Sequence, residues 1–429
     1  ISIYKTLFSV HSYILTSLTR FTDNVVFYTI EGNPLSKNSI NYEKKLKFQL
    51  EFINQMKMEK RRAYRENTEI CIDMHIFTNA DNPPHIQTIP KNYLDLLSEP
   101  VDSSKINRNN ILFNDDKQVS YLNVVYEMEN VKKPRIEFMV YKYRHLIEDI
   151  RLAQALILGY FNDEDDEIRH INSLNVHDKS FFNAYKDYSK YIQDGEAYKS
   201  RVVDWFELFK IQDALFRENR FKIHDMFRLL CDSIPYYATI NNYGMNIYKK
   251  IKEEMGDLSL KNDISSIEID RKLDELFRIK IDKLPSKKGD TKLLKEEIRY
   301  KMREYKSKYT FLNQLVIPVS LKVLYKPFEN SIFHKDLDNI MKIVVPIFHD
   351  EFKPPVSIQA LRNYEDNFGE NIEMIKRIPK GINYQIRGYE IIKVPKGQAY
   401  DSEGYIVIGI SDGYSPSLIS YTNKIILND

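Results

Sequence analysis

The chain has 429 residues, which is enough for two or three domains of ordinary size. With 43% hydrophobic and 29% charged residues, its composition is typical of a globular protein and excludes a largely disordered chain. The 63 basic and 61 acidic residues nearly cancel, which excludes a protein that attracts nucleic acid through its overall charge. Any surface that binds nucleic acid must therefore be local.

The cysteine content and the hydropathy pattern indicate the compartment. Cys71 and Cys231 lie far apart and match no metal-binding spacing, so we expect a reducing compartment and a cytoplasmic protein. No apolar run reaches the roughly 18 residues that a membrane-spanning helix needs. Residues 1–24 lack the cleavage pattern of a signal peptide and are predicted to form an N-terminal helical segment.

A first α/β domain is predicted over residues 25–143. Its elements, in chain order, are a strand at Val25–Thr29, a turn at Ile30–Lys37, a charged helix at Tyr42–Met58, a strand at Glu69–Phe77, a helix-like stretch after Gln87–Asn92, and strands at Ser120–Met128 and Arg135–Tyr141. The pair Asp115-Asp116 precedes the third of these strands. Such a pair is typical of a turn, and it is also a candidate source of metal ligands.

A helical insert is predicted over residues 144–276, because apolar residues recur there at intervals of three to four with few helix breakers. Its helices are expected at His145–Tyr160, Ser180–Gln193, Glu196–Ser233 and Asn242–Met255. The acidic run Asp163–Glu167 is best interpreted as a solvated loop, since consecutive acids point in different directions. The insert is a candidate binding region for a protein partner.

A second α/β domain, predicted over residues 277–429, repeats the order of the first. Its elements are a strand at Phe277–Lys280, a turn at Ile281–Lys287, a helix at Thr291–Lys308, a strand at Val316–Tyr325, a helix after His334–Asn339 and a closing strand at Tyr405–Ile410. We therefore expect an internal duplication, with the helical insert between the two copies.

The most informative string in the second copy is Asp336-Leu337-Asp338-Asn339-Ile340-Met341-Lys342. Carboxylate oxygens are the hard ligands that Mg²⁺ prefers, and a site with few of them leaves room for water and phosphate oxygens. Lys342 could stabilise the negative charge that develops during attack on a phosphodiester. The alternative is that Asp336 or Asp338 only caps the helix that follows.

The first copy has lost this string. In the alignment of the two copies, Ile89 and Lys91 stand where Asp336 and Asp338 stand. The pair Asp115-Asp116 is in turn expected to have no acidic counterpart in the second copy, where we align it with Lys353–Ile358. Each copy thus keeps a different part of the acidic residue set.

Taken together, these landmarks resemble the RusA-type Holliday-junction resolvases. Members of that family have a Gly-x-Pro-x-Ser-Lys turn, then Asp-x-Asp-Asn-x-x-Lys, then Asp-Asp-x-Gln-Val or -Ile ahead of a strand. The resemblance covers roughly residues 25–141 and 277–413. It implies two small α/β domains that pack as an internal pseudo-dimer, since the family acts as a homodimer on branched DNA with Mg²⁺.

Carried over residue by residue, the resemblance implies a catalytic set of Asp336, Asp338, Asn339 and Lys342, with Asp336 and Asp338 as metal ligands. The third carboxylate stays open. Asp350 or Glu351 could supply it from the second copy, or Asp115 and Asp116 could reach across from the first.

Basic residues concentrate after each Ser-Lys turn and predict a phosphate-binding surface shared by the two copies. The mixed charges also allow a solvated helix face. The candidate DNA-binding residues are Lys37, Lys60, Arg61, Arg62, Lys287, Lys288, Lys292 and Arg299.

Two functions remain open from the sequence. The first is a Mg²⁺-dependent, structure-selective endonuclease that hydrolyses branched or junction DNA in recombination or repair. The second is a catalytically inactive DNA-structure-binding or scaffold protein that keeps the resolvase fold.

Overall fold

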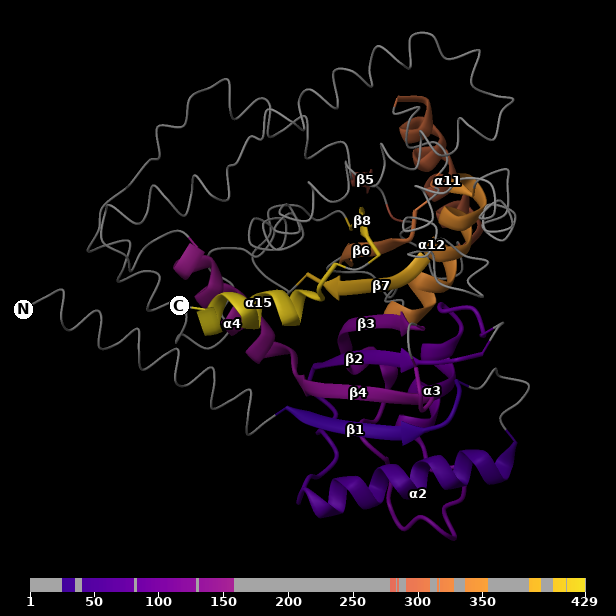
Figure 1. Cartoon of the computed structure of the whole chain (residues 1–429), viewed down its shortest axis with the longest axis vertical. Helices are drawn as coiled ribbons and strands as arrows, with labels where there is room; N and C mark the ends of the chain where they lie inside the picture. Colours follow the sequence, from indigo (N-terminus) through magenta and orange to yellow (C-terminus); the bar gives the residue numbers. More distant parts are fainter. Residues whose placement is uncertain are drawn as a thin grey trace, which may run out of the picture.

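The computed structural model describes a mixed α/β protein built on one eight-stranded sheet (Figure 1). The described residues are 25–34, 41–80, 83–128, 131–157, 278–282, 284, 291–308, 315, 317–327, 336–353, 386–394, 404–413 and 415–428. Almost all of the predicted helical insert, with its acidic run, and the N-terminal segment 1–24 lie outside these residues.

The elements occur twice in the same order. The first series comprises β1 (Val26–Glu31), α2 (Tyr42–Met58), β2 (Ile70–Phe77), α3 (Ile89–Ser98), the 3₁₀ turn η2 (Asp116–Gln118), β3 (Val119–Glu127), β4 (Arg135–Lys142) and α4 (Tyr143–Ile157). The second comprises β5 (Arg278–Ile281), α11 (Thr291–Lys308), β6 (Val319–Lys326), α12 (Leu337–Phe352), β7 (Ile386–Lys393), β8 (Tyr405–Asp412) and α15 (Leu418–Asn428). The strands and helices of the two series correspond one to one, in line with the repeat found in the sequence.

The strand order across the sheet is β1-β4-β2-β3-β7-β6-β8-β5. In the first half, β4 is antiparallel to both β1 and β2, and β2 is parallel to β3. In the second half, β8 is antiparallel to both β5 and β6, and β6 is parallel to β7. The halves meet where β3 and β7 pair antiparallel, from Tyr121 opposite Ile392 to Val125 opposite Gly388. The two predicted domains thus share one continuous sheet.

Alternating side chains divide the core between the two faces of the sheet. One core cluster joins strand residues such as Ile72 and Leu122 to α2, α3, α11 and α12, and the other joins Cys71 and Tyr121 to α4 and α15. Along α2, Phe48, Phe52 and Met56 recur every fourth residue and are buried against the first cluster. The helices that carry the candidate site motifs, α3 and α12, therefore lie on the same face of the sheet (Figure 1).

One prediction about the second copy is wrong. The strand that corresponds to β3 is β7, which begins at Ile386, so Lys353–Ile358 is not the counterpart of Asn114–Val119. Lys353 instead follows the last turn of α12. In the corrected alignment, the residue opposite Asp116 by sequence is Asn383, so the second copy still lacks the acidic pair.

Gly388 lies where the two halves of the sheet meet, and it allows β7 to approach β3 closely. A Cβ atom at this position would lie 3.1 Å from the carbonyl oxygen of Val124 and 3.1 Å from Cγ2 of Val125. We expect Gly388→Val to lower the free energy of unfolding by about 1–3 kcal/mol, since overpacked cores lose that much. Urea denaturation measures this loss. Combining Gly388→Ala with Val125→Ala should cost less than Gly388→Ala alone, and an equal cost would contradict the proposed clash.

Candidate metal centre

Three carboxylates from distant parts of the chain come together beside the β3–β7 seam. One oxygen from each of Asp115, Asp116 and Asp336 can be chosen so that the three atoms lie within 4.8 Å of one another. Asp115 and Asp116 come from the 3₁₀ turn that leads into β3, whereas Asp336 precedes α12. We call these three residues the acidic cluster. The structure thus joins the Asp-Asp pair of the first copy to the motif of the second.

Asp336 occupies the N-cap position of α12 without capping it. Its backbone is extended, yet its side chain accepts no hydrogen bond from the amides of the first turn. Its Oδ2 atom accepts from the side-chain amide of Asn339 at 2.9 Å instead. The structure therefore does not support the alternative that Asp336 only caps the helix. Its carboxylate is hydrogen-bonded to Asn339 of the same motif instead.

Asp338 lies one residue inside α12 and is almost fully buried, with 1% of its surface exposed. Its Oδ2 accepts a hydrogen bond from Nζ of Lys342 at 3.0 Å, one helical turn later. Among the described residues, Oδ1 of Asp338 and Oδ1 of Asp336 are buried and have no hydrogen-bond partner. Buried carboxylate oxygens without a donor are costly, so a cation would find unused ligand atoms here.

Lys91 brings a positive charge into the acidic cluster. Its Nζ atom lies 2.5 Å from Oδ2 of Asp116 and 3.0 Å from Oδ1 of Asp95. Burial works against the ammonium, but the hydrogen bonds to Asp116 and Asp95 outweigh it and raise the pKa of Lys91. Lys91 therefore remains charged at neutral pH.

The acids of the cluster titrate differently from one another. Burial, helped by repulsion from Asp336, raises the pKa of Asp116 to about 6, although Lys91 opposes this shift. Burial and the neighbouring Asp338 carboxylate likewise raise the pKa of Asp336. For Asp115, burial is outweighed by hydrogen bonds that include those from the Lys117 backbone amide and side chain, and its pKa is lowered.

The pKa values of Asp116 and Lys91 are both raised, with different consequences for the charge of each group. A raised pKa favours the neutral form of the Asp116 carboxyl but the charged form of the Lys91 amine. At neutral pH both groups are still ionised, because Asp116 titrates below 7 and Lys91 above it. Two of the three carboxylates, Asp116 and Asp336, have raised pKa values, which is typical of a functional site because the repulsion that contributes to the shifts costs folding energy. A divalent cation would relieve that repulsion.

Of the two candidate sources of a third carboxylate, the structure places only the pair Asp115 and Asp116 near Asp336. Asp350 and Glu351 lie in the last turn of α12, which puts them about 20 Å along the helix axis from Asp336. Glu351 is paired there with Arg303 at 3.0 Å and with Lys306 at 3.8 Å. Asp115 and Asp116 are the pair that reaches Asp336.

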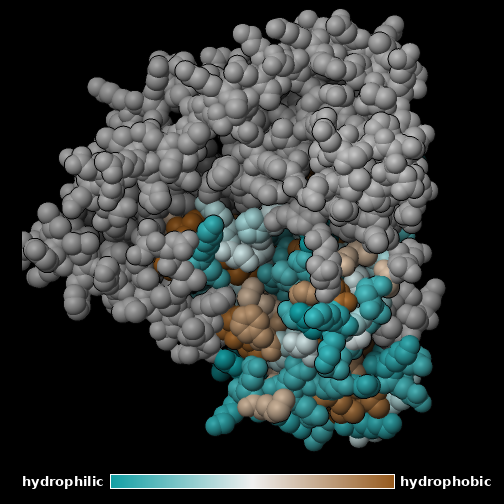
Figure 2. Space-filling view, in the orientation of Figure 1, coloured by the Kyte–Doolittle hydropathy of each residue, from teal (hydrophilic) through white to brown (hydrophobic). Residues whose placement is uncertain are grey.

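The predicted DNA-binding residues are only partly described. Lys60, Arg62, Lys292 and Arg299 are exposed, and Arg61 is half-buried; Lys37, Lys287 and Lys288 lie outside the described residues. Figure 2 shows the end of the molecule around α2 as mainly hydrophilic, with small apolar patches between the polar side chains. Arg65 belongs near the acidic cluster, because its carbonyl accepts from Gln118 at 2.8 Å and Gln118 also contacts the backbone amide of Asp115. Arg65 is one of the basic residues that follow the first Ser-Lys turn, where the sequence predicts a phosphate-binding surface.

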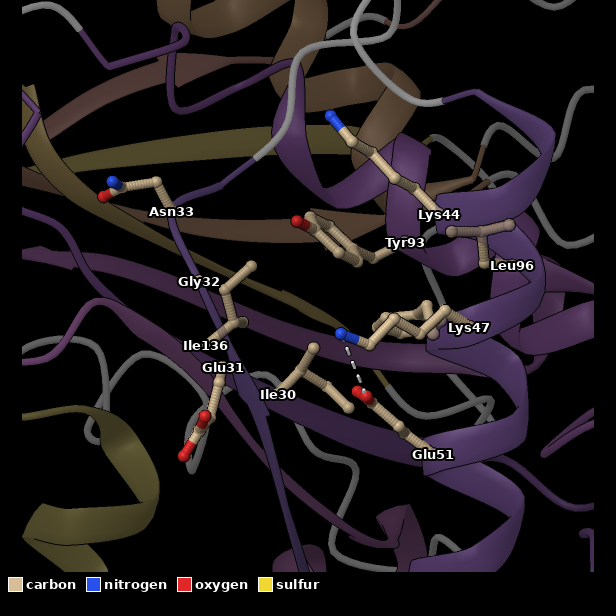
Figure 3. Close-up of a pocket in the computed structure, with 11 residues that line it drawn as sticks. Ile30, Glu31, Gly32, Asn33, Lys44, Lys47, Glu51, Tyr93, Leu96 and Ile136 are labelled. Atoms are coloured by element: carbon tan, nitrogen blue, oxygen red, sulfur yellow. Dashed lines mark ion pairs between the residues drawn. The ribbon is translucent and has the colours of Figure 1, made fainter.

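A separate pocket of about 280 Å³ lies between the end of β1 and the helices α2 and α3 (Figure 3). Its wall carries Lys44, Lys47 and the ring of Tyr93, and Lys47 is paired with Glu51 at 3.6 Å. Ile30, Leu96 and other apolar side chains complete the lining. None of the acidic cluster lines this pocket, so it is a distinct feature of the first half.

None of the helices in the described part of the chain combines the length and apolar character that crossing a bilayer requires. Comparison with known proteins adds no family. No family model, no curated protein and no solved structure matches the chain.

Proposed function

We propose that this protein is a Mg²⁺-dependent endonuclease of the RusA type that acts on branched or junction DNA. The observation that carries the proposal is the approach of Asp115 and Asp116 to Asp336 within 4.8 Å. These residues, far apart in sequence, are brought together by the pairing of β3 with β7 and by the packing of α12 against β3 and α3. Carboxylates brought together in this way repel one another, so their convergence favours a role in binding a cation.

The residue set fits a hard divalent cation. Asp115, Asp116 and Asp336 offer only oxygen ligands, and Asp336 keeps a buried oxygen without a hydrogen-bond partner among the described residues. A bound Mg²⁺ would polarise a phosphodiester and lower the pKa of an attacking water. Asp336 and the Asp115-Asp116 pair would hold the ion.

The other motif residues fix the geometry of these ligands. Asn339 donates to Oδ2 of Asp336 at 2.9 Å and thereby orients this carboxylate. Lys342 neutralises Asp338, which would otherwise be a buried charge without a counterion. Lys117, exposed beside Asp115, and Arg65 could contact the phosphates that flank the cleaved bond.

The repeated topology supports the further proposal that the two halves form an internal pseudo-dimer of RusA-like units. Each half has the same order and polarity of strands, and the halves meet through the antiparallel pair of β3 and β7. Isologous interfaces are self-complementary, so a duplicated unit can pack against its copy in the manner of a homodimer. The acidic residues of both copies supply one cluster, which favours a single cut over paired cleavage of a junction.

A second candidate function is binding of branched DNA without cleavage. It is favoured by the ion pair between Lys91 and Asp116, since this ammonium already neutralises one carboxylate of the acidic cluster. A protein of this kind would bind junctions with or without Mg²⁺.

Cleavage assays on labelled four-way, flap and linear duplex DNA distinguish the two functions. We expect cutting of a branched substrate with Mg²⁺ and none with EDTA. Asp336→Asn should abolish the cutting, whereas the matched change Asp350→Asn, at the far end of the same helix, should leave it intact. Junction binding without cutting by the wild-type protein would support the second function and contradict the first.

A further inference from the structure

Lys91 and Asp338 hold equivalent places in the two copies. When α3 is aligned with α12 in this register, Tyr93 and Leu94 fall opposite Ile340 and Met341, and all four side chains are buried. The duplication has thus placed a lysine where the other copy has an aspartate, which reverses the charge at one position.

The ammonium of Lys91 lies among carboxylates. It contacts Asp116 at 2.5 Å and Asp95 at 3.0 Å, and the charge of Asp338 also acts on it. Asp116 is in turn a member of the acidic cluster. The structure therefore already holds one cation, a covalently attached one, inside this group of acids.

The charges of the surroundings agree with this interpretation. Four aspartates and two lysines are linked here by ion pairs or by the approach of their carboxylates: Asp95, Asp115, Asp116 and Asp336, with Lys91 and Lys117. When all are ionised, four negative and two positive charges leave the group at −2, which one divalent ion balances; Asp338 and Lys342 form a separate pair without net charge. Without Lys91 the group would carry −3 and attract a further cation.

We infer that Lys91 is a tethered cation that takes the place of a metal ion between Asp116 and Asp95, so that the chain binds one divalent ion fewer than it would without this lysine. This inference rests on the proposed function in taking the cluster to be a cation site. It assigns Lys91 a role in setting how many metal ions bind.

The inference is tested by counting bound Mn²⁺ by electron paramagnetic resonance in the full-length protein and its variants. We expect Lys91→Met, which keeps the length of the side chain and removes its charge, to bind one more Mn²⁺ per chain than the wild type. Lys91→Arg keeps the charge and should match the wild type. The double variant Lys91→Met/Asp95→Asn should lose the additional ion, because Asp95 contacts Lys91 at 3.0 Å and is not one of the proposed ligands of the first ion.

An unchanged number of ions in Lys91→Met would overturn the inference, as would an additional ion that persists in the double variant. Circular dichroism checks that each variant folds, and Lys91→Gln replaces the methionine variant if that one does not. The Mn²⁺ counts test the inference about Lys91 and the proposed function separately. A wild-type protein that binds no Mn²⁺ would contradict that function, whereas a gain of one ion on loss of Lys91 would still support the tethered cation.

Discussion

Replacing Lys322 with methionine is expected to lower the free energy of unfolding by about 3–5 kcal/mol, because it leaves the carboxylate of Glu390 buried without its counterion. Lys322 and Glu390 are 8% and 1% exposed, and Nζ of Lys322 lies 2.6 Å from Oε2 of Glu390. Their strands, β6 and β7, are neighbours with these two residues in register. Few single substitutions in this chain should cost more.

The pair belongs to a row of buried polar residues that crosses the middle of the sheet. Asn123 stands opposite Glu390 across the β3–β7 seam, and its side-chain amide donates to Asp73 of β2 at 2.7 Å. Glu390 also accepts hydrogen bonds from the hydroxyl of Tyr121 and from the backbone amide of Leu418, the latter at 2.6 Å. The row therefore ties the two halves of the sheet to each other and to α15.

A double substitution distinguishes two causes of the lost stability: the unpaired charge left on Glu390 and the removal of the Lys322 side chain itself. Lys322→Met combined with Glu390→Gln removes both charges and keeps an acceptor for the Leu418 amide, so it should recover most of the lost stability. Urea denaturation followed by circular dichroism measures both variants. Lys292→Met is the matched control, since this exposed lysine lies 3.9 Å from Glu296 and surface pairs contribute less than about 1 kcal/mol. A loss at Lys322 no greater than at Lys292 would contradict the argument.

Local patterns predicted most of the regular elements. The helices Tyr42–Met58 and Thr291–Lys308 were predicted with their observed bounds, because apolar residues at helical spacing mark them clearly. Strands β2, β3, β4, β6 and β8 were predicted to within three residues at either end. The helix expected at His145–Tyr160 corresponds to α4, at Tyr143–Ile157. For these segments, side-chain periodicity was sufficient to predict the structure.

Strand β7 and helix α15 were not predicted from the sequence, and for β7 there is a physical reason. The second copy was assumed to have the same spacing as the first, but the connection between α12 and β7 runs from Lys353 to Gln385, longer than the one between α3 and η2. The free energy of closing a loop rises only slowly with its length, so the length of a connection is weakly constrained. Arg387, Gly388 and Glu390 also dilute the apolar pattern of β7.

The candidate site was predictable only in part. The motif of Asp336, Asp338, Asn339 and Lys342 can be found from the sequence because its members are neighbours in the chain. The approach of Asp115 and Asp116 depends on which strands pair at the middle of the sheet, and the sequence left that open. The position of Lys91 in the alignment was visible, whereas the direction of its ammonium, toward Asp116, is a property of the packed structure.

If the two copies build one site, then Asp116→Asn and Asp336→Asn should each reduce cleavage of a branched substrate by about 10³-fold or more, and the double variant should be little worse than either single variant. Groups that act as one unit are strongly non-additive in this way, because removing the first already removes the function of the rest. The measurement is a double-mutant cycle on single-turnover cleavage rates with Mg²⁺. Asp95→Asn is the matched control, since Asp95 contacts Lys91 at 3.0 Å but is not a member of the acidic cluster, and it should change the rate far less. Multiplicative losses in the double variant would mean that the two aspartates serve separate sites. That outcome would contradict a joint site even if the protein cleaves DNA, because the proximity of Asp116 to Asp336 would then have no consequence for the chemistry.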